Sequence, residues 1–181
     1  MSQTDTIEVD AKTVDIPATP DPVLVSDVVR SDRLLLANNA VKNHVIAATG
    51  VSLIPVPGVD LAAVMGIQLD MAHSLCKIYE VPFKEKLVRS LLTSLVGSAG
   101  MAAALAGLAS LAKAVPVLGS ISGAAAMSAT AAAVTYATGK VLTKHFEMGG
   151  TFENFDPVKF KEMFKEKIKE GAEVVKSVKA A

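Results

Sequence analysis

The sequence predicts an all-α protein built from helical hairpins, and three observations support this. From Ser90 to Gly139 the chain carries a single charged residue, Lys113, among many small residues. Elsewhere apolar residues recur every three or four positions, the period of a buried helix face. Proline and glycine gather at a few points, which mark where helices end. Hydrophobic residues make up 51% of the chain but aromatic residues only 4%, so close helix packing must replace bulky side chains.

Residues 1–25 read as a disordered acidic arm, because they combine prolines with acidic residues and show no sustained periodicity. The whole chain has a formal net charge of zero, and it offers no basic surface for nucleic acid. Residues 1–30 contain Lys12 and Arg30 against Asp5, Glu8, Asp10, Asp15, Asp21 and Asp27. The first residues lack the basic and apolar regions of a cleaved secretory signal.

A first helix is predicted at 26–49, with Ser26 or Asp27 as its N-cap. Pro55 and Pro57 then interrupt the chain, because each removes a backbone donor and disfavours helix before it. A second helix is expected from just after Gly58 to a point before Pro82. Asp60 would lie in its first turn, where a carboxylate complements the helix dipole.

Two further helices form a hairpin at 84–113 and 118–145, separated by the break from Lys113 to Gly119. Residues 26–148 thus form a hydrophobic helical domain. Residues 149–181 are a linker and a C-terminal amphipathic helix, which Asp156 caps and Pro157 begins. Its apolar stripe can pack on the body or lie on a membrane, and its mixed charges favour packing on protein: Phe160, Phe164, Ile168, Ala172 and Val175.

Small residues repeat every four positions on both arms of this hairpin, which allows two helix backbones to approach closely. We therefore expect a helix-packing interface at Ser94, Ser98, Ala102, Ala106, Ser110, Gly119 and Gly123. Since about 20 helical residues span the bilayer's apolar layer of about 30 Å, the favoured interpretation is a pair of membrane-crossing helices. The alternative is a soluble, self-assembling protein that buries this hairpin in a homo-oligomeric core.

Charge placement indicates a cytoplasmic membrane location with both termini in the cytoplasm. Lys113 stands alone at the tip of the hairpin, whereas five cations flank its base: Lys84, Lys86, Arg89, Lys140 and Lys144. Membrane lipid and further copies of the chain are the partners that this arrangement predicts.

Few residues suggest chemistry. Asp60 and Gln68 lie eight positions apart, on one helix face, and form a candidate polar seam for a partner. The alternative, which we favour, is a helix cap and a core hydrogen bond. His73, Cys76 and Asp70 are close in sequence, but a structural zinc site needs four ligands. We predict no metal, no cofactor and no catalytic residue, because Cys76 has no base placed beside it.

The segment around Pro55 resembles a known family of unknown function. That family includes inner-membrane YcjF-type proteins and domains appended to Era-like GTPases. The likeness runs from about Asn38 to Lys144, and the residues that carry it are Pro55, Pro57, Asp60, Gln68, Met71 and Tyr79. Glu80 departs from the pattern, since a glycine is more usual there, so we expect a different helix end.

The resemblance implies a small, helical, membrane-associated domain that often accompanies a GTPase. Together with the hydrophobic hairpin, this leads us to expect a role in scaffolding, oligomerisation or membrane remodelling, with a GTPase as a partner. It brings no catalytic residues. The sequence contains no GxxxxGK[ST] phosphate-binding loop, so nucleotide hydrolysis would belong to that partner.

Overall fold

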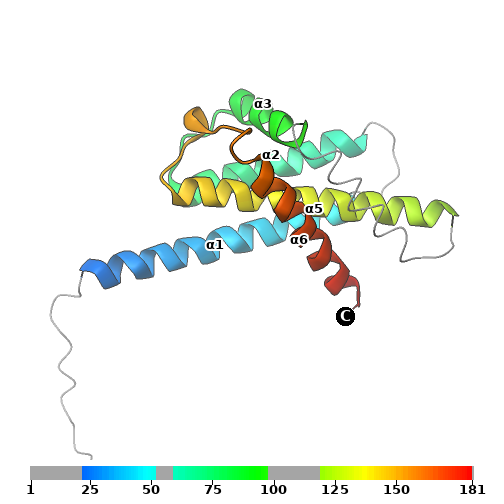
Figure 1. Cartoon of the computed structure of the whole chain (residues 1–181), viewed down its shortest axis with the longest axis horizontal. Helices are drawn as coiled ribbons and strands as arrows, with labels where there is room; N and C mark the ends of the chain where they lie inside the picture. The colour runs from blue at the N-terminus through cyan, green and yellow to red at the C-terminus, as the bar shows by residue number, and fades with distance from the viewer. Residues whose placement is uncertain (1–21, 52–58, 98–118, 181) are drawn as a thin grey trace, which may run out of the picture.

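A computed structural model describes residues 22–51, 59–97 and 119–180, and within these ranges the fold is all-α, as predicted. Figure 1 shows the elements in order. They are α1 (Pro22–Val51), α2 (Val59–Tyr79), α3 (Glu85–Leu95), α5 (Gly119–Glu147), the short 3-10 helix η2 (Phe152–Asn154) and α6 (Lys161–Ala180).

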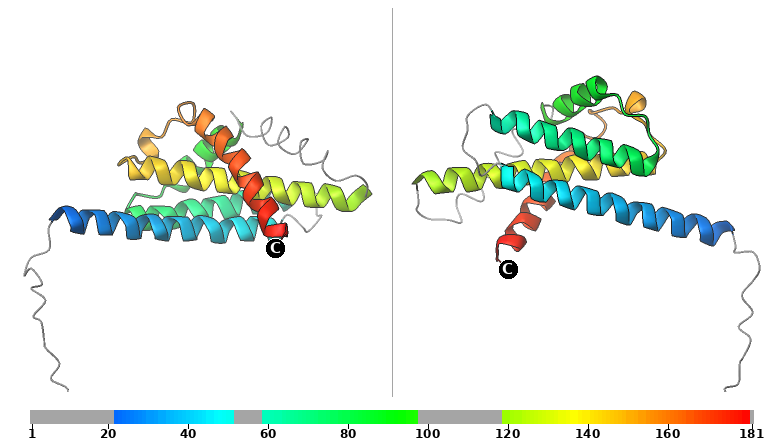
Figure 2. Two further views of the ribbon diagram at one scale, coloured as in Figure 1. Left: turned by 60° about the horizontal axis from the view of Figure 1, so that its bottom comes forward. Right: turned by 180° about the vertical axis from the view of Figure 1, so that it is seen from behind.

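Three long helices, α1, α2 and α5, lie side by side, with α1 antiparallel to the other two (Figure 2). The third turn of α1 meets the ends of α2 and α5, where Arg30 pairs with Glu147 and Tyr79 donates a hydrogen bond to Glu147. At the other end, the Ser128 hydroxyl of α5 donates to the backbone carbonyl of Thr49 in α1. Since α2 and α5 run parallel, the end of α2 and the start of α5 lie at opposite ends of the bundle.

The helix α5 lies at the centre of the bundle, in contact with α1, α2 and α6. Small residues let it approach closely: a Cβ atom added to Gly139 would lie 2.5 Å from Cγ2 of Val41 and 3.1 Å from Sδ of Met71. From Ser128 to Phe146 most of its side chains are buried, including several alanines and threonines. The Ala-rich pattern thus serves helix-to-helix contact inside the protein along this part of α5.

The helix α6 crosses α5 and packs on it (Figure 1). The crossing point is Gly171, where an added Cβ would lie 3.1 Å from the backbone of Ala133. Phe164 and Ile168, from the predicted apolar stripe, are buried in the common core. Of the two alternatives for this helix, packing on the body is the one that the structure shows.

Two predicted helix starts are wrong. The first helix begins at Pro22, whose fixed φ suits a first helical turn, and Ser26 lies inside it with its hydroxyl bonded to the carbonyl of Val23. The last helix begins at Lys161 instead of Asp156. The Asp156 carboxylate accepts a hydrogen bond from the amide of Val158, and this holds a turn before the helix.

The hairpin is described only in part. Its first arm is present as α3, which buries Val88, Leu92 and Leu95, and the remainder of that arm lies in residues 98–118, outside the described ranges. The second arm is present as α5. Across the described ranges, no helix, α5 included, combines the length and the apolar character needed to cross a membrane.

Two helices end in the same motif. At Glu80 the φ angle is +57°, and the amide of Val81 donates to the carbonyl of Cys76. Gly149, with a φ of +76°, ends α5 in the same way, since the amide of Gly150 donates to the carbonyl of His145. We expected a different helix end at Glu80, but the backbone geometry there is the same as at Gly149. Instead, a residue with a side chain occupies the left-handed conformation that glycine favours.

We expect Glu80→Gly to stabilise the fold by about 1 kcal/mol, because it removes the left-handed strain of a residue with a Cβ. Chemical denaturation measures the change. Gly149→Ala is the matched control and should destabilise by about the same amount. A loss of stability in Glu80→Gly would show that the glutamate side chain contributes a contact of its own.

Gly139→Ala should destabilise the fold by about 1 to 3 kcal/mol, because the new methyl group overlaps Val41 in a packed core. Gly66→Ala is the control: it lies in α2 with nothing near its added Cβ, and should stabilise by up to about 1 kcal/mol through helix propensity. Thermal unfolding of the two variants tests this, and equal melting temperatures would contradict the close approach at Gly139.

Candidate interaction surface

The most prominent surface feature of the described residues is an apolar face on α1. Five large aliphatic side chains on this helix are between 49% and 61% exposed: Val28, Val29, Leu35, Leu36 and Ile46. We call them the α1 outer face. Large aliphatic side chains that gather on the exposed side of a helix make that side a candidate interaction surface.

The α1 outer face is exposed because the opposite side of α1 makes the contacts with the bundle. Ala37, Val41 and Ala48 are buried there, against α2 and α5. The first turns of α1 also project past the other helices (Figure 1). The helix therefore carries apolar residues on two sides, and only one side is used within the chain.

A polar cluster, the clamp, fixes α1 where it meets the ends of α2 and α5. The Arg30 guanidinium lies 3.0 Å from the Glu147 carboxylate, and the Tyr79 hydroxyl donates to the same carboxylate at 2.7 Å. Arg33 lies over the ring of Tyr79, 5.8 Å from its centroid. These contacts join three helices through a single carboxylate.

The clamp holds Glu147 in its charged form. Burial opposes the charge, but hydrogen bonds from Tyr79 and Arg30 outweigh that effect and lower the pKa of the carboxyl below 4.5. Burial, together with the hydrogen bond to Glu147, raises the pKa of Tyr79, so its hydroxyl keeps the proton that it donates. The clamp is thus a stable structural contact at neutral pH.

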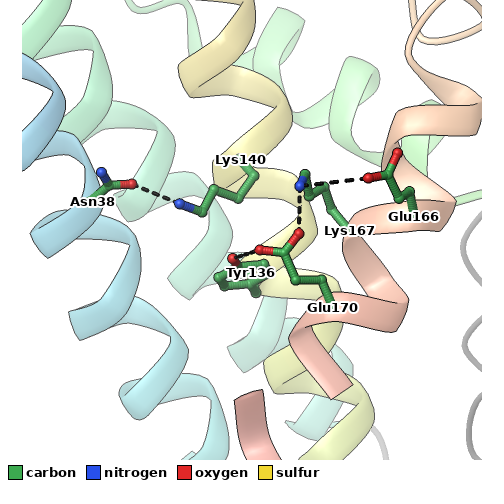
Figure 3. Close-up of polar contacts among 6 residues, drawn as sticks. All are labelled: Asn38, Tyr136, Lys140, Glu166, Lys167 and Glu170. Atoms are coloured by element: carbon green, nitrogen blue, oxygen red, sulfur yellow. Dashed lines mark hydrogen bonds and ion pairs between the residues drawn. The ribbon is translucent and has the colours of Figure 1, made fainter. Parts of the chain in front are cut away.

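A second polar cluster joins α1, α5 and α6 (Figure 3). Lys140 donates to Asn38 of α1 at 2.8 Å and lies over the ring of Tyr136, while the Tyr136 hydroxyl donates to Glu170 of α6. Lys167 pairs with Glu170 and lies 3.9 Å from Glu166. Hydrogen bonds from Lys167 and Tyr136 lower the pKa of Glu170. This cluster holds α6 against α5.

The contacts of His145 also serve the fold. Its Nε2 lies 2.8 Å from the backbone carbonyl of Thr151 and 3.1 Å from Oδ1 of Asn154, and the rings of Phe155 and Phe160 pack edge-on against it. Gly150 has room for no side chain here, because a Cβ would overlap the imidazole. His145 therefore fastens the segment after α5 to the helix.

The family model described as a domain of unknown function, DUF697, matches residues 23–173. The chain belongs to this family. The matched range includes the whole α1 outer face, the clamp and the α5–α6 cluster. The DUF697 assignment agrees with the resemblance found in the sequence at the level of the family.

Magnetosome membrane protein 22 of Magnetospirillum gryphiswaldense is similar to this DUF697 chain. It is 37% identical over 167 residues, which cover 92% of this chain and 84% of the relative. No solved structure matches the chain.

The predicted helix-packing residues of this DUF697 chain fall in different places. Ser94 is exposed near the end of α3, and Ser98, Ala102, Ala106 and Ser110 lie outside the described residues. Gly119 and Gly123 belong to the first turns of α5, where only the backbone is described. The described residues therefore do not test the proposed stripe, and it remains a prediction.

The polar seam lies on α2. Gln68 is buried, and its Oε1 has no hydrogen-bond partner in the described part of the chain. Asp60 is in the first turn of α2, as expected, but its side chain is outside the description. We favoured a core hydrogen bond for Gln68, but its Oε1 forms none with any described residue.

The sequence neighbours His73, Cys76 and Asp70 have separate environments. His73 packs on the ring of Phe83, and Asp70 pairs with His44 of α1. Cys76 is buried, and burial raises the pKa of its thiol to about 11, which keeps it protonated. In the described ranges, no group of His, Cys, Asp and Glu is placed to hold a metal ion.

The α1 outer face was not predicted from the sequence. Helical spacing predicts a helix at 26–49, but it does not show which of its apolar residues the rest of the chain covers. The available signal was that apolar residues surround α1, including the run from Leu34 to Leu36, which no single buried face can hold.

The clamp predicts a pH dependence of stability. Because the folded pKa of Glu147 lies below 4.5, its contribution is fully present above that pH and is lost as the pH falls through the folded pKa. Glu147→Gln should therefore lower the urea midpoint equally at about pH 6 and about pH 8, with a difference that shrinks below pH 4.5.

Glu85→Gln is the control for this experiment, because Glu85 pairs with Arg89 on an exposed helix surface where the pair contributes little. A gap between wild type and Glu147→Gln that widens as the pH falls would contradict the clamp.

Proposed function

We propose that this DUF697 chain is a non-enzymatic, membrane-associated helical protein that acts in scaffolding, oligomerisation or remodelling of a membrane. The similarity to a magnetosome membrane protein over 92% of the chain supports a place at a membrane. The directions of α3 and α5 also support the proposal. α3 starts at the clamp end and runs toward the opposite end, from which α5 starts (Figure 1).

Residues 98–118 connect these two helices and carry a single charge, Lys113. In this proposal the segment meets the membrane at the end of the bundle opposite the clamp. Burial of its leucines in lipid supplies the attachment, at about 25 cal/mol for each Å² of apolar surface removed from water.

The charges support a cytoplasmic position for the bundle and both termini at the cytoplasmic membrane. Lys84 contacts Glu153 of η2, just after the end of α5, so the start of α3 and the end of α5 are neighbours. The cations of the hairpin base therefore gather near the clamp: Lys84, Lys86, Arg89, Lys140 and Lys144. This matches the bias of Lys and Arg toward the cytoplasm.

A GTPase is the proposed protein partner. The support is the likeness of the chain to domains that accompany Era-like GTPases, together with the lack of a phosphate-binding loop in its own sequence. In this role the bundle would anchor or cluster the GTPase at the membrane.

A second candidate is a soluble, self-assembling helical protein. The observation that favours it is the burial of α5 from Ser128 to Phe146 by other helices of the chain. Part of the apolar sequence is thus covered without lipid, and self-association would cover more.

Membrane fractionation separates the two candidates. The expressed chain should stay in the membrane pellet after carbonate extraction and enter solution with detergent. Leu105→Glu with Leu108→Glu should move most of it to the soluble fraction, because two charges in the segment oppose burial in lipid.

The matched control places two glutamates at exposed apolar positions of the bundle, Met148→Glu with Val158→Glu, and should stay in the pellet. Release of the wild-type chain without detergent would exclude the membrane proposal and leave the soluble assembly.

A further inference from the structure

The exposed side of α1 contains a heptad seam. Starting at Val28, exposed residues follow one another in alternating steps of four and three, the repeat of helices that wind around a partner helix. The seam consists of Val28, Asp32, Leu35, Asn39, Lys42 and Ile46.

We propose that α1 pairs with α1 of a second copy of the chain in antiparallel orientation, with the two-fold axis level with Ala37. This deepens the oligomerisation that the proposed function includes. In this register each residue of the seam faces a different seam residue of the second copy. Because the dimer is symmetric, every such pair occurs twice. Val28 meets Ile46 of the second copy, Asp32 meets its Lys42, and Leu35 meets its Asn39.

The charges of the seam select this register. Asp32 and Lys42 are both exposed and form no ion pair with another described residue of the chain. They lie ten positions apart, about 15 Å along the helix, so they cannot pair within one α1. A parallel dimer would set Asp32 against Asp32 and Lys42 against Lys42, which is unfavourable, whereas the antiparallel dimer forms two opposite-charge pairs.

The same register covers the rest of the α1 outer face. Val29 and Leu36 flank the seam on one side. In the antiparallel pair, Leu36 lies beside the two-fold axis, close to Leu36 of the second copy, and Val29 lies near its Asn43. All five exposed aliphatic residues of the α1 outer face are therefore removed from water in one contact.

Lipid is a poorer occupant of this surface. Asp32 and Asn39 lie in the middle of the seam, and a carboxylate or an amide without a partner is costly to bury in an apolar layer. In the dimer Asp32 meets the oppositely charged Lys42 across the seam, a partner that lipid does not offer. A second copy thus fits the pattern of charges as well as the apolar residues.

Charge reversal tests the proposal on the full-length chain in mild detergent, with particle size measured by sedimentation equilibrium. Asp32→Lys and Lys42→Asp should each raise the dimer dissociation constant by about tenfold or more, because each creates two like-charge pairs. The double variant, Asp32→Lys with Lys42→Asp, should restore dimerisation, since the opposite-charge pairs are remade with reversed sign.

Lys86→Asp on the exposed side of α3 is the control and should leave the dissociation constant unchanged. Circular dichroism on every variant reports whether the fold is retained. Rescue by the double variant cannot come from a repaired monomer, because the two positions are too far apart in one chain. A monomeric wild type, or single reversals without effect on particle size, would overturn the proposal.

Cysteine pairs test the orientation. Val28→Cys with Ile46→Cys should form disulfide-linked dimers, whereas Val28→Cys alone should not, because the two copies of position 28 lie about 27 Å apart in the antiparallel pair. Cys76 is buried and does not compete. Crosslinking by Val28→Cys alone would show a parallel arrangement and overturn the register.

The same samples distinguish this inference from the proposed function. Each reversal variant should remain in the membrane pellet, since the α1 outer face is not the surface assigned to lipid. Movement of the single reversals to the soluble fraction with unchanged particle size would assign this face to the membrane and overturn the dimer. Release of the wild type from the membrane refutes the membrane role alone.

Discussion

The close approach of α5 to α1 and α2 is the constraint on which this structure depends. Alanine and glycine bury little area each, so a core made of them is stable only when helix backbones come near enough for dense packing. Gly139 is where that approach is tightest, against Val41 and Met71. Polar contacts then fix the position of the helices along their axes. These contacts are the clamp at one end and the hydrogen bond from Ser128 to the carbonyl of Thr49 at the other.

This packing also explains why α1 can be apolar on two sides. Two of the three buried residues in the described part of α1 are alanines, Ala37 and Ala48, whereas leucines and Ile46 lie on the outside. An all-helical protein that attaches to a membrane through one end and to its own copies along a flank would need such a division of surfaces. In the two proposals made above these surfaces belong to different segments, residues 98–118 for lipid and α1 for a second copy of the chain.

Much of the fold could be predicted from the sequence because strong local signals control it. Proline at positions 55, 57 and 82 bounded α2, and the spacing from Phe164 to Ile168 identified the face that α6 buries. The start of α6 was predicted wrongly because the Asp156 carboxylate holds a turn before the helix instead of capping the helix itself. The sequence shows apolar residues on more than one side of α1, but which side stays exposed could not be predicted, and neither could the environment of Gln68. Both depend on which side of a helix the rest of the chain covers.

The clamp has a consequence for biosynthesis. Arg30 and Glu147 are separated by 117 positions in sequence, and α1 binds α5 more extensively than it binds α2. A ribosome therefore releases α1 long before its main partner exists, and the ordering of such distant contacts is slow compared with local helix formation. Until α5 emerges, both apolar sides of α1 are open to chaperones, to lipid or to another nascent chain.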